Sequence, residues 1–170
     1  MIDLSQRPSI KGLHAIGLLS SFSDSELERI LDLGRMMIFE DHTNIIIEGE
    51  ISGGLYIITK GIVGVFKTNS LNGQNYDIGH LRAGAVFGEM SLVDENPRST
   101  TVRALTQVAV YSIPRDEFKS FISSSSELEH KFLSNCVKVL ASIVRELNDK
   151  YVISQYQLWE SALRRGEQAS

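Results

Sequence analysis

The sequence predicts an α+β fold in which a small antiparallel barrel or roll carries short flanking helices and one long C-terminal helix. Residues 36–68 contain short runs rich in Ile, Val, Tyr and Phe that are separated by glycines, and residues 100–113 contain two more such runs. Short β-rich runs at even spacing are typical of a closed or rolled antiparallel sheet. Residues 127–165 contain neither Gly nor Pro, which predicts one long helix.

Helix-start signals frame the strand-rich region. Ser23 begins a Ser-x-x-Glu capping box ahead of apolar residues spaced for one helix face, so a short helix is expected before the strands. Pro114 suits a helix start, which predicts a short helix over 115–122. A second Ser-x-x-Glu box predicts Ser126 as the N-cap of the long helix. The chain therefore divides into an N-terminal helical segment (1–20), a roll domain (21–122) and a long dimerisation helix with a tail (123–170).

The long helix carries an apolar stripe with alternating intervals of four and three residues. Val at the a positions with Leu at the d positions favours a parallel two-stranded coiled coil, so we expect a homodimer through residues 127–158. Docking along its own domain is the alternative, but the helix would extend about 55 Å at 1.5 Å per residue, longer than a small domain is wide. Tyr156 and Trp159 lie off the stripe, available for another contact or for a neighbouring protomer. The stripe consists of Leu133, Val137, Leu140, Val144, Leu147, Tyr151, Ser154 and Leu158.

The most informative motif is FGEMSLVDENPRSTTV at residues 87–102. Gly88 has no Cβ and lets a ligand approach the backbone, and the turn after it exposes N–H groups that attract anions. Arg98 presents a planar fork that matches two phosphate oxygens, on a backbone stiffened by Pro97. Glu89 would repel a phosphate but can accept hydrogen bonds from sugar hydroxyls. The motif thus predicts a site for a sugar phosphate.

This motif closely resembles the phosphate-binding cassette of the cyclic nucleotide-binding domain family, which includes the kinase regulatory subunits and the bacterial catabolite activator protein. The resemblance covers roughly residues 18–122 and implies an antiparallel β-roll, a double-stranded jelly-roll-like barrel. A surface ion pair between Glu89 and Arg98 is the simpler alternative, but the glycine, the proline, the hydroxyls and the spacing agree on the ligand site. The implied ligand-binding residues are Gly88, Glu89, Met90, Ser91, Arg98, Ser99 and Thr100.

Composition narrows the classes of function. The chain has 170 residues, a formal net charge of −4 and no basic cluster, which argues against a nucleic-acid surface. Cys136 is the single cysteine and the four histidines show no ligand spacing, so no metal site is expected. No apolar run is long enough to span a membrane, and no signal peptide is recognised. We therefore expect a cytoplasmic protein.

The sequence favours a non-catalytic receptor for a cyclic mononucleotide, cAMP rather than cGMP, that signals through its C-terminal helix to a partner protein. A general base beside the phosphate, which an enzyme would need, is not recognised. The alternative is a scaffold protein with a degenerate, nucleotide-free pocket and a working coiled coil. The resemblance places the base near Ile143 and Val144, whose apolar side chains do not read a purine edge, so base-reading residues stay unassigned. The helix ends without a recognisable DNA-binding unit, which predicts a stand-alone sensor.

Overall fold

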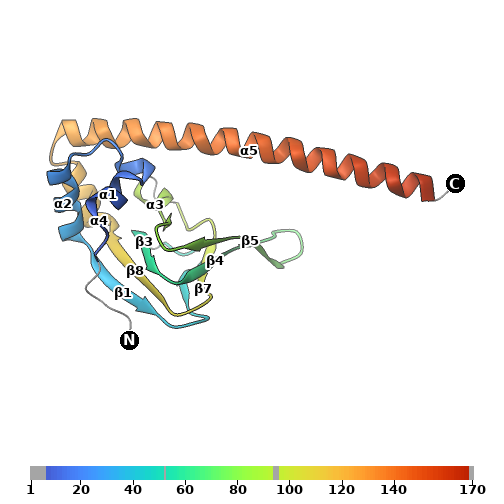
Figure 1. Ribbon diagram of the computed structural model, residues 1–170, viewed down its shortest axis with the longest axis horizontal. Helices are drawn as coiled ribbons and strands as arrows, with labels where there is room; N and C mark the ends of the chain where they lie inside the picture. Colours follow the sequence, from blue (N-terminus) through green and yellow to red (C-terminus); the bar gives the residue numbers. More distant parts are fainter. Residues whose placement is uncertain (1–6, 52, 94–95, 169–170) are drawn as a thin grey trace.

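Two four-stranded antiparallel sheets form the centre of the molecule (Figure 1). The computed structural model describes residues 7–51, 53–93 and 96–168. The strand order is β1-β8-β3-β6 in one sheet and β2-β7-β4-β5 in the other. The expected fold class, an antiparallel β-roll with flanking helices and a long C-terminal helix, is confirmed. The strands are β1 (Arg35–Phe39), β2 (Asn44–Ile46), β3 (Gly54–Lys60), β4 (Ile62–Thr68), β5 (Asn75–Arg82), β6 (Val86–Phe87), β7 (Thr101–Ala104) and β8 (Val108–Pro114).

Five α-helices and one 3₁₀ helix are found among the described residues, and all of them except the far part of α5 gather at one end of the roll (Figure 1). They are α1 (Ile10–His14), the 3₁₀ helix η1 (Gly17–Leu19), α2 (Asp24–Leu33), α3 (Met90–Val93), α4 (Arg115–Ile122) and α5 (Ser126–Gln168). The predicted capping box opens α2, where the Ser23 side chain accepts from the Glu26 amide and the Glu26 carboxylate accepts from the Ser23 amide. Pro114 is the N-cap of α4, as its fixed φ suggested.

The interior of the roll is filled by side chains that alternate along both sheets. Ile46, Ile58, Val63, Phe87 and Val102 are members of this core and are at most 5% exposed. The sharp corner between β3 and β4 requires a glycine, because Gly61 has φ +92° and a Cβ there would lie 2.6 Å from a backbone oxygen. The two sheets therefore close over an apolar interior and leave the ends of β6 and β7 to shape a site.

A second core joins the helices to the roll. It draws buried side chains from η1, α2, β8, α4 and the start of α5, including Leu19, Phe118 and Phe132. The Tyr111 hydroxyl donates to the Leu31 carbonyl at the end of α2, and the Arg7 guanidinium donates to the same carbonyl at 2.7 Å. Because this core contains residues of the N-terminal helices and of the start of α5, the first turns of α5 are packed against the domain.

Helix α5 begins in contact with the domain and then extends past the roll (Figure 1). Its 43 residues correspond to about 65 Å at 1.5 Å per residue. The predicted N-cap is wrong by one residue: Ser126 is already helical, and the Ser125 hydroxyl accepts from the Glu127 amide at 3.2 Å. In a run of four serines each hydroxyl can serve as a cap, so the sequence alone did not distinguish them.

Two strands were missed in the sequence, and several predicted segments lie outside the described ranges. β5 and β6 were not expected, whereas the other six strands match the β-rich runs noted above. Residues 1–6 of the N-terminal segment, 94–95 of the cassette and 169–170 of the tail lie outside the described residues. Among the residues that are described, no helix combines the length and apolarity needed to cross a bilayer.

Candidate functional site

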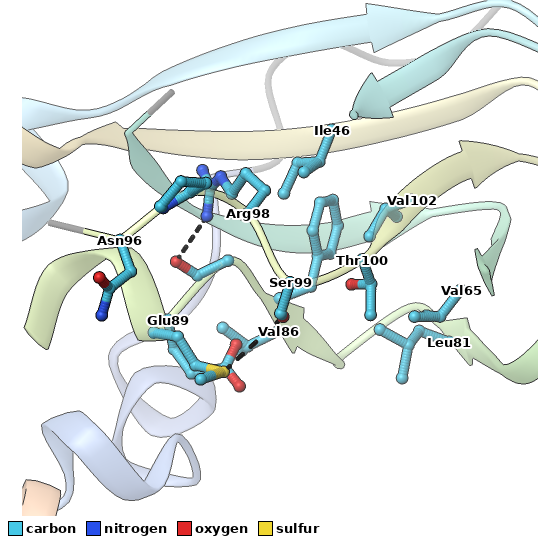
Figure 2. A pocket seen from close by; sticks show the side chains of 14 residues that line it. Ile46, Val65, Leu81, Val86, Glu89, Asn96, Arg98, Ser99, Thr100 and Val102 are labelled. Atoms are coloured by element: carbon cyan, nitrogen blue, oxygen red, sulfur yellow. Dashed lines mark hydrogen bonds between the residues drawn. The ribbon is translucent and has the colours of Figure 1, made fainter. Parts of the chain in front are cut away.

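A cavity of about 390 Å³ opens between the end of β6, α3 and the segment that leads into β7 (Figure 2). One end of this cavity is polar, and Figure 2 shows Glu89, Arg98 and Ser99 there. The other end is apolar and is formed by strand side chains that face inward. Its lining residues are Ile46, Val65, Leu81, Val86, Phe87 and Val102. A molecule with one anionic end and one flat apolar end matches this division.

The backbone conformation at residue 88 requires a glycine. Gly88 has φ +81°, a conformation that side chains with a Cβ rarely adopt. A Cβ built there would lie 2.6 Å from the Gly54 carbonyl oxygen and 3.2 Å from the Tyr56 ring. The glycine thus lets the chain turn sharply out of β6 into α3 against β3. This turn places Glu89 and Met90 at the rim of the cavity.

Arg98 is a buried cation at the polar end of the cavity. Its side chain is 7% exposed, and its guanidinium donates to the Gly88 carbonyl at 3.0 Å and to the Gly54 carbonyl at 3.3 Å. Burial lowers the pKa of this guanidinium, and the Glu89 carboxylate acts in the opposite direction. An arginine stays protonated despite such a shift, so the cavity holds a permanent positive charge. The planar fork is oriented by two carbonyls before any anion arrives.

The remaining predicted residues are arranged around this charge. Six of the seven line the cavity, namely Gly88, Glu89, Met90, Arg98, Ser99 and Thr100. Ser91 lies in α3 and its side chain is outside the described part of the structure. The Ser99 hydroxyl is directed toward the Met90 sulfur at 3.9 Å, and both residues line the cavity (Figure 2). The structure brings six of the seven predicted residues together, and their contact with a ligand stays a prediction.

The expected contribution from the long helix is not seen at this cavity. Its lining, among the described residues, contains no side chain of α5, so Ile143 and Val144 do not cover it. A neighbouring cavity of about 280 Å³ does reach α5, because Val139 and Glu89 both line it. Glu89 therefore faces two spaces, one beside Arg98 and one beside α5.

The sequence analysis did not identify the apolar wall or the polar neighbour Asn96, both of which line the cavity. The signal for the wall was present, since alternate residues of a strand face one side of a sheet. Which face points into the cavity depends on how the two sheets close, and that is set by pairings far apart in the chain. Among the described residues, no group of three or more His, Cys, Asp and Glu side chains is arranged to hold a metal ion.

The arrangement can bind and orient a small anion with a polar and an apolar part, and this defines a ligand-binding β-roll. The chain belongs to the cyclic nucleotide-binding domain family: the model of the family described as "Cyclic nucleotide-binding domain" matches residues 36–125, more than half of the chain. The matched region contains the cavity and its polar end.

Relatives named for regulation by cyclic nucleotides are similar to this chain. The cyclic AMP receptor protein of Thermus thermophilus is 27% identical over 129 residues, which cover 76% of this chain and 57% of the relative. The regulatory subunit of cAMP-dependent protein kinase from Aspergillus niger is 29% identical over 68% of this chain and 27% of the relative. The chain thus spans between about a quarter and somewhat more than half of these curated relatives.

Solved structures share the fold. The catabolite activator protein of Thermus thermophilus has a TM-score of 0.68 and 25% identity, covering 81% of this chain and 62% of that chain. The N-terminal domain of a transcriptional regulator from Streptomyces coelicolor A3(2) has a TM-score of 0.70 and 20% identity, covering 80% of this chain and 94% of that chain. The second likeness concerns the fold alone.

Proposed function

We propose that the chain is a non-catalytic receptor for a cyclic mononucleotide. The observation that carries this proposal is the buried Arg98 guanidinium at the polar end of a cavity whose other end is apolar. A cyclic phosphate supplies one anionic charge and two exocyclic oxygens for the fork, and a purine supplies a flat ring for the apolar wall. Glu89 is placed at the polar end, where it can accept a hydrogen bond from the ribose 2′-hydroxyl.

We propose cAMP as the preferred nucleotide over cGMP. The two curated relatives described above are named for cAMP, whereas the cGMP-dependent protein kinase 2 of Mus musculus is 28% identical over 86% of this chain, so the relatives and the family match support a cyclic nucleotide ligand in general. The apolar wall favours stacking, whereas recognition of the guanine edge needs polar groups facing the ring. Of the polar lining residues, Glu89, Asn96 and Arg98 lie at one end of the cavity, whereas Thr100 alone lies beside Val102 at the apolar wall (Figure 2).

Calorimetric titration of the purified chain with cAMP, cGMP and 5′-AMP tests the proposal. We expect one site per chain, the tightest binding with cAMP, and much weaker binding of 5′-AMP, whose open doubly charged phosphate lacks the cyclic geometry. A mixed cyclic dinucleotide serves as a further competitor. If no cyclic mononucleotide binds, the pocket is degenerate and the scaffold function considered from the sequence takes its place.

The role of Glu89 is tested with a double-mutant-style cycle. Glu89→Gln and a 2′-deoxy nucleotide should each weaken binding, because a hydrogen bond to a charged group contributes about 1.5–3 kcal/mol and each change removes part of it. The two losses should be less than additive, since both remove the same contact. Fully additive losses would show that Glu89 does not touch the ribose.

We further propose that the signal leaves through α5, in a parallel homodimer formed by residues 127–158, to a partner protein in the cytoplasm. The a and d side chains Val137, Val144 and Leu147 are 56–67% exposed in the single chain, which leaves the seam open for a second helix. The single cysteine, Cys136, is buried and free, which suits a reducing compartment.

Hydrogen exchange with and without cAMP should show added protection in the cassette and in residues 114–147. Protection confined to 87–102 would favour a passive nucleotide binder over a switch.

A further inference from the structure

A lysine outside the cavity holds the backbone of the cassette. The ladder between β4 and β7 ends at the pair Phe66 and Thr101. The next residue of β4, Lys67, continues the connection with its side chain, because its Nζ donates to the Ser99 carbonyl at 2.8 Å. Lys67 is not among the residues that line the cavity, so this contact approaches the cassette from another side.

Glu48 holds this lysine in place. One carboxylate oxygen of Glu48 lies 2.5 Å from the Lys67 Nζ, and the other accepts from the Thr68 amide at 2.9 Å. The Glu48 amide in turn donates to the Thr101 hydroxyl at 3.0 Å. Lys67 and the Thr68 amide together lower the pKa of the Glu48 carboxyl to about 2, so the pair is fully charged near neutral pH.

The backbone on either side of Glu48 is also joined to the cassette. The Gly49 amide donates to the Arg98 carbonyl at 2.9 Å, and the Arg98 amide donates to the Glu50 carbonyl at 3.0 Å. Arg98 is thus fixed by main-chain hydrogen bonds, whereas Ser99 and Thr100 lie in a bend beyond any strand. The Ser99 carbonyl in that bend accepts instead from the side chain of Lys67.

A peptide unit is planar, and in the trans form its C=O and N–H point in opposite directions. The Ser99 carbonyl and the Thr100 amide belong to the same unit. Holding the carbonyl on the Lys67 side therefore directs the Thr100 N–H away from Lys67. Ser99 and Thr100 both line the cavity, next to Arg98. Rotation of this one peptide unit would remove an N–H donor from the place where an anion meets the guanidinium.

We propose that Lys67 and Glu48 are positioning residues for the anion site: they orient the Ser99–Thr100 peptide so that its N–H serves the phosphate. This inference rests on the proposed function, because the phosphate is that of the cyclic nucleotide. Lys67 acts through the carbonyl and not by contact with the ligand. The pair carries no net charge, so its effect on affinity is one of geometry more than of long-range attraction.

The test compares Lys67→Met with Lys60→Met by calorimetry with cAMP. Both variants lose one lysine from the roll, but Lys60 is an exposed residue at the end of β3, where it is paired with Ala109 of β8. We expect Lys67→Met to weaken binding about 3- to 10-fold, as the loss of a partly exposed charged hydrogen bond suggests. Lys60→Met should change affinity less than about twofold, and Lys67→Arg should restore most of the loss because it can still donate to Ser99.

A spectroscopic readout separates orientation from general stability. In ¹⁵N-labelled chain without nucleotide, Lys67→Met should shift the Thr100 amide nitrogen resonance, since the hydrogen bond to the preceding carbonyl polarises that peptide. Saturating cAMP should then move the Thr100 amide proton downfield in the unchanged chain and clearly less in Lys67→Met. The melting temperature serves as the control for unfolding.

Equal affinity in Lys67→Met and the unchanged chain would overturn the positioning role. So would an equal loss in Lys60→Met, which would indicate a general charge effect. If the unchanged chain binds no cyclic nucleotide, the proposed function fails instead. In that case a shifted Thr100 resonance in Lys67→Met still shows that the pair orients this peptide, and an unshifted one overturns that part too.

Discussion

Replacement of Arg98 by alanine should affect folding and binding by separable amounts. The guanidinium satisfies the Gly88 and Gly54 carbonyls, and the side chain is 7% exposed. An unsatisfied buried polar group costs about 1–3 kcal/mol, and water from the adjoining cavity relieves part of that cost. We therefore expect a loss of roughly 1–3 kcal/mol in the free energy of unfolding. For a chain of this size that lowers the melting temperature by roughly 2–12 °C.

The effect on nucleotide affinity should be larger. Removing one partner of a hydrogen-bonded charge pair that is shielded from water costs about 2–5 kcal/mol, which is about 30-fold to several thousandfold in Kd. Arg98→Lys keeps the charge but loses the planar fork, so it should lose most of this affinity as well. Isothermal titration calorimetry with cAMP measures the affinities, and differential scanning calorimetry measures the stabilities.

Arg103→Ala is the matched control for this experiment. Arg103 lies in β7, where its Nε donates to the Asn44 side chain and its guanidinium lies over the Phe66 ring, outside the cavity. The Arg103→Ala variant should lose some folding stability and keep its affinity for cAMP. Unchanged affinity in Arg98→Ala would refute the assignment of Arg98 to the phosphate. A complete loss of folding in Arg98→Ala would leave Arg98→Lys, which retains a donor, to decide.

Three further outcomes are expected. The double variant Val144→Lys/Leu147→Lys should sediment as a monomer, because like charges would then face each other across a parallel seam. Val152→Lys, which lies off the stripe, is the control, and an unchanged chain that is monomeric at micromolar concentration contradicts the coiled coil. Glu48→Gln should flatten the pH dependence of the free energy of unfolding, because the lowered pKa of the folded Glu48 carboxyl gives stability above about pH 4.5 that is lost as the pH falls toward 2. Equal acid-unfolding profiles of Glu48→Gln and the unchanged chain would contradict the Glu48–Lys67 pair. Asn135→Leu should cost about 1–3 kcal/mol of unfolding free energy in denaturant titration, because the fully buried amide donates to the Leu18 carbonyl at 3.0 Å; Asn148→Leu on the exposed face should be neutral.

The parts of the fold that could be predicted depend on local chemistry. The capping box at Ser23 and the proline before α4 act within one helical turn, so the sequence contains the whole interaction. The cassette was recognised for the same reason, because Gly88 and Arg98 belong to one short segment with a required backbone conformation.

The missed parts depend on pairing between distant segments. β5 is exposed at nearly every position, so it shows no apolar alternation and owes its extended form to its pairing with β4. The turn residues Asn72 and Gly73 were the available signal for that hairpin. The contact between Lys67 and Ser99 joins residues 32 positions apart, and neither residue is unusual in its own segment.

Under the proposed function, we infer that occupation of the site reaches α5 through η1. Helix α5 packs against η1, where the Asn135 amide is tied to Leu18 and a Cβ on Gly17 would lie 2.7 Å from Val139. Residues of η1 line the neighbouring cavity together with Glu89 and Val139. A ligand shifts a conformational equilibrium only by binding one position better than another. In this proposal Glu89 would provide such a difference, because its movement toward a ribose would change the cavity wall to which η1 and Val139 also contribute. The apolar stripe of α5 beyond Val139 would then shift in position when Glu89 moves.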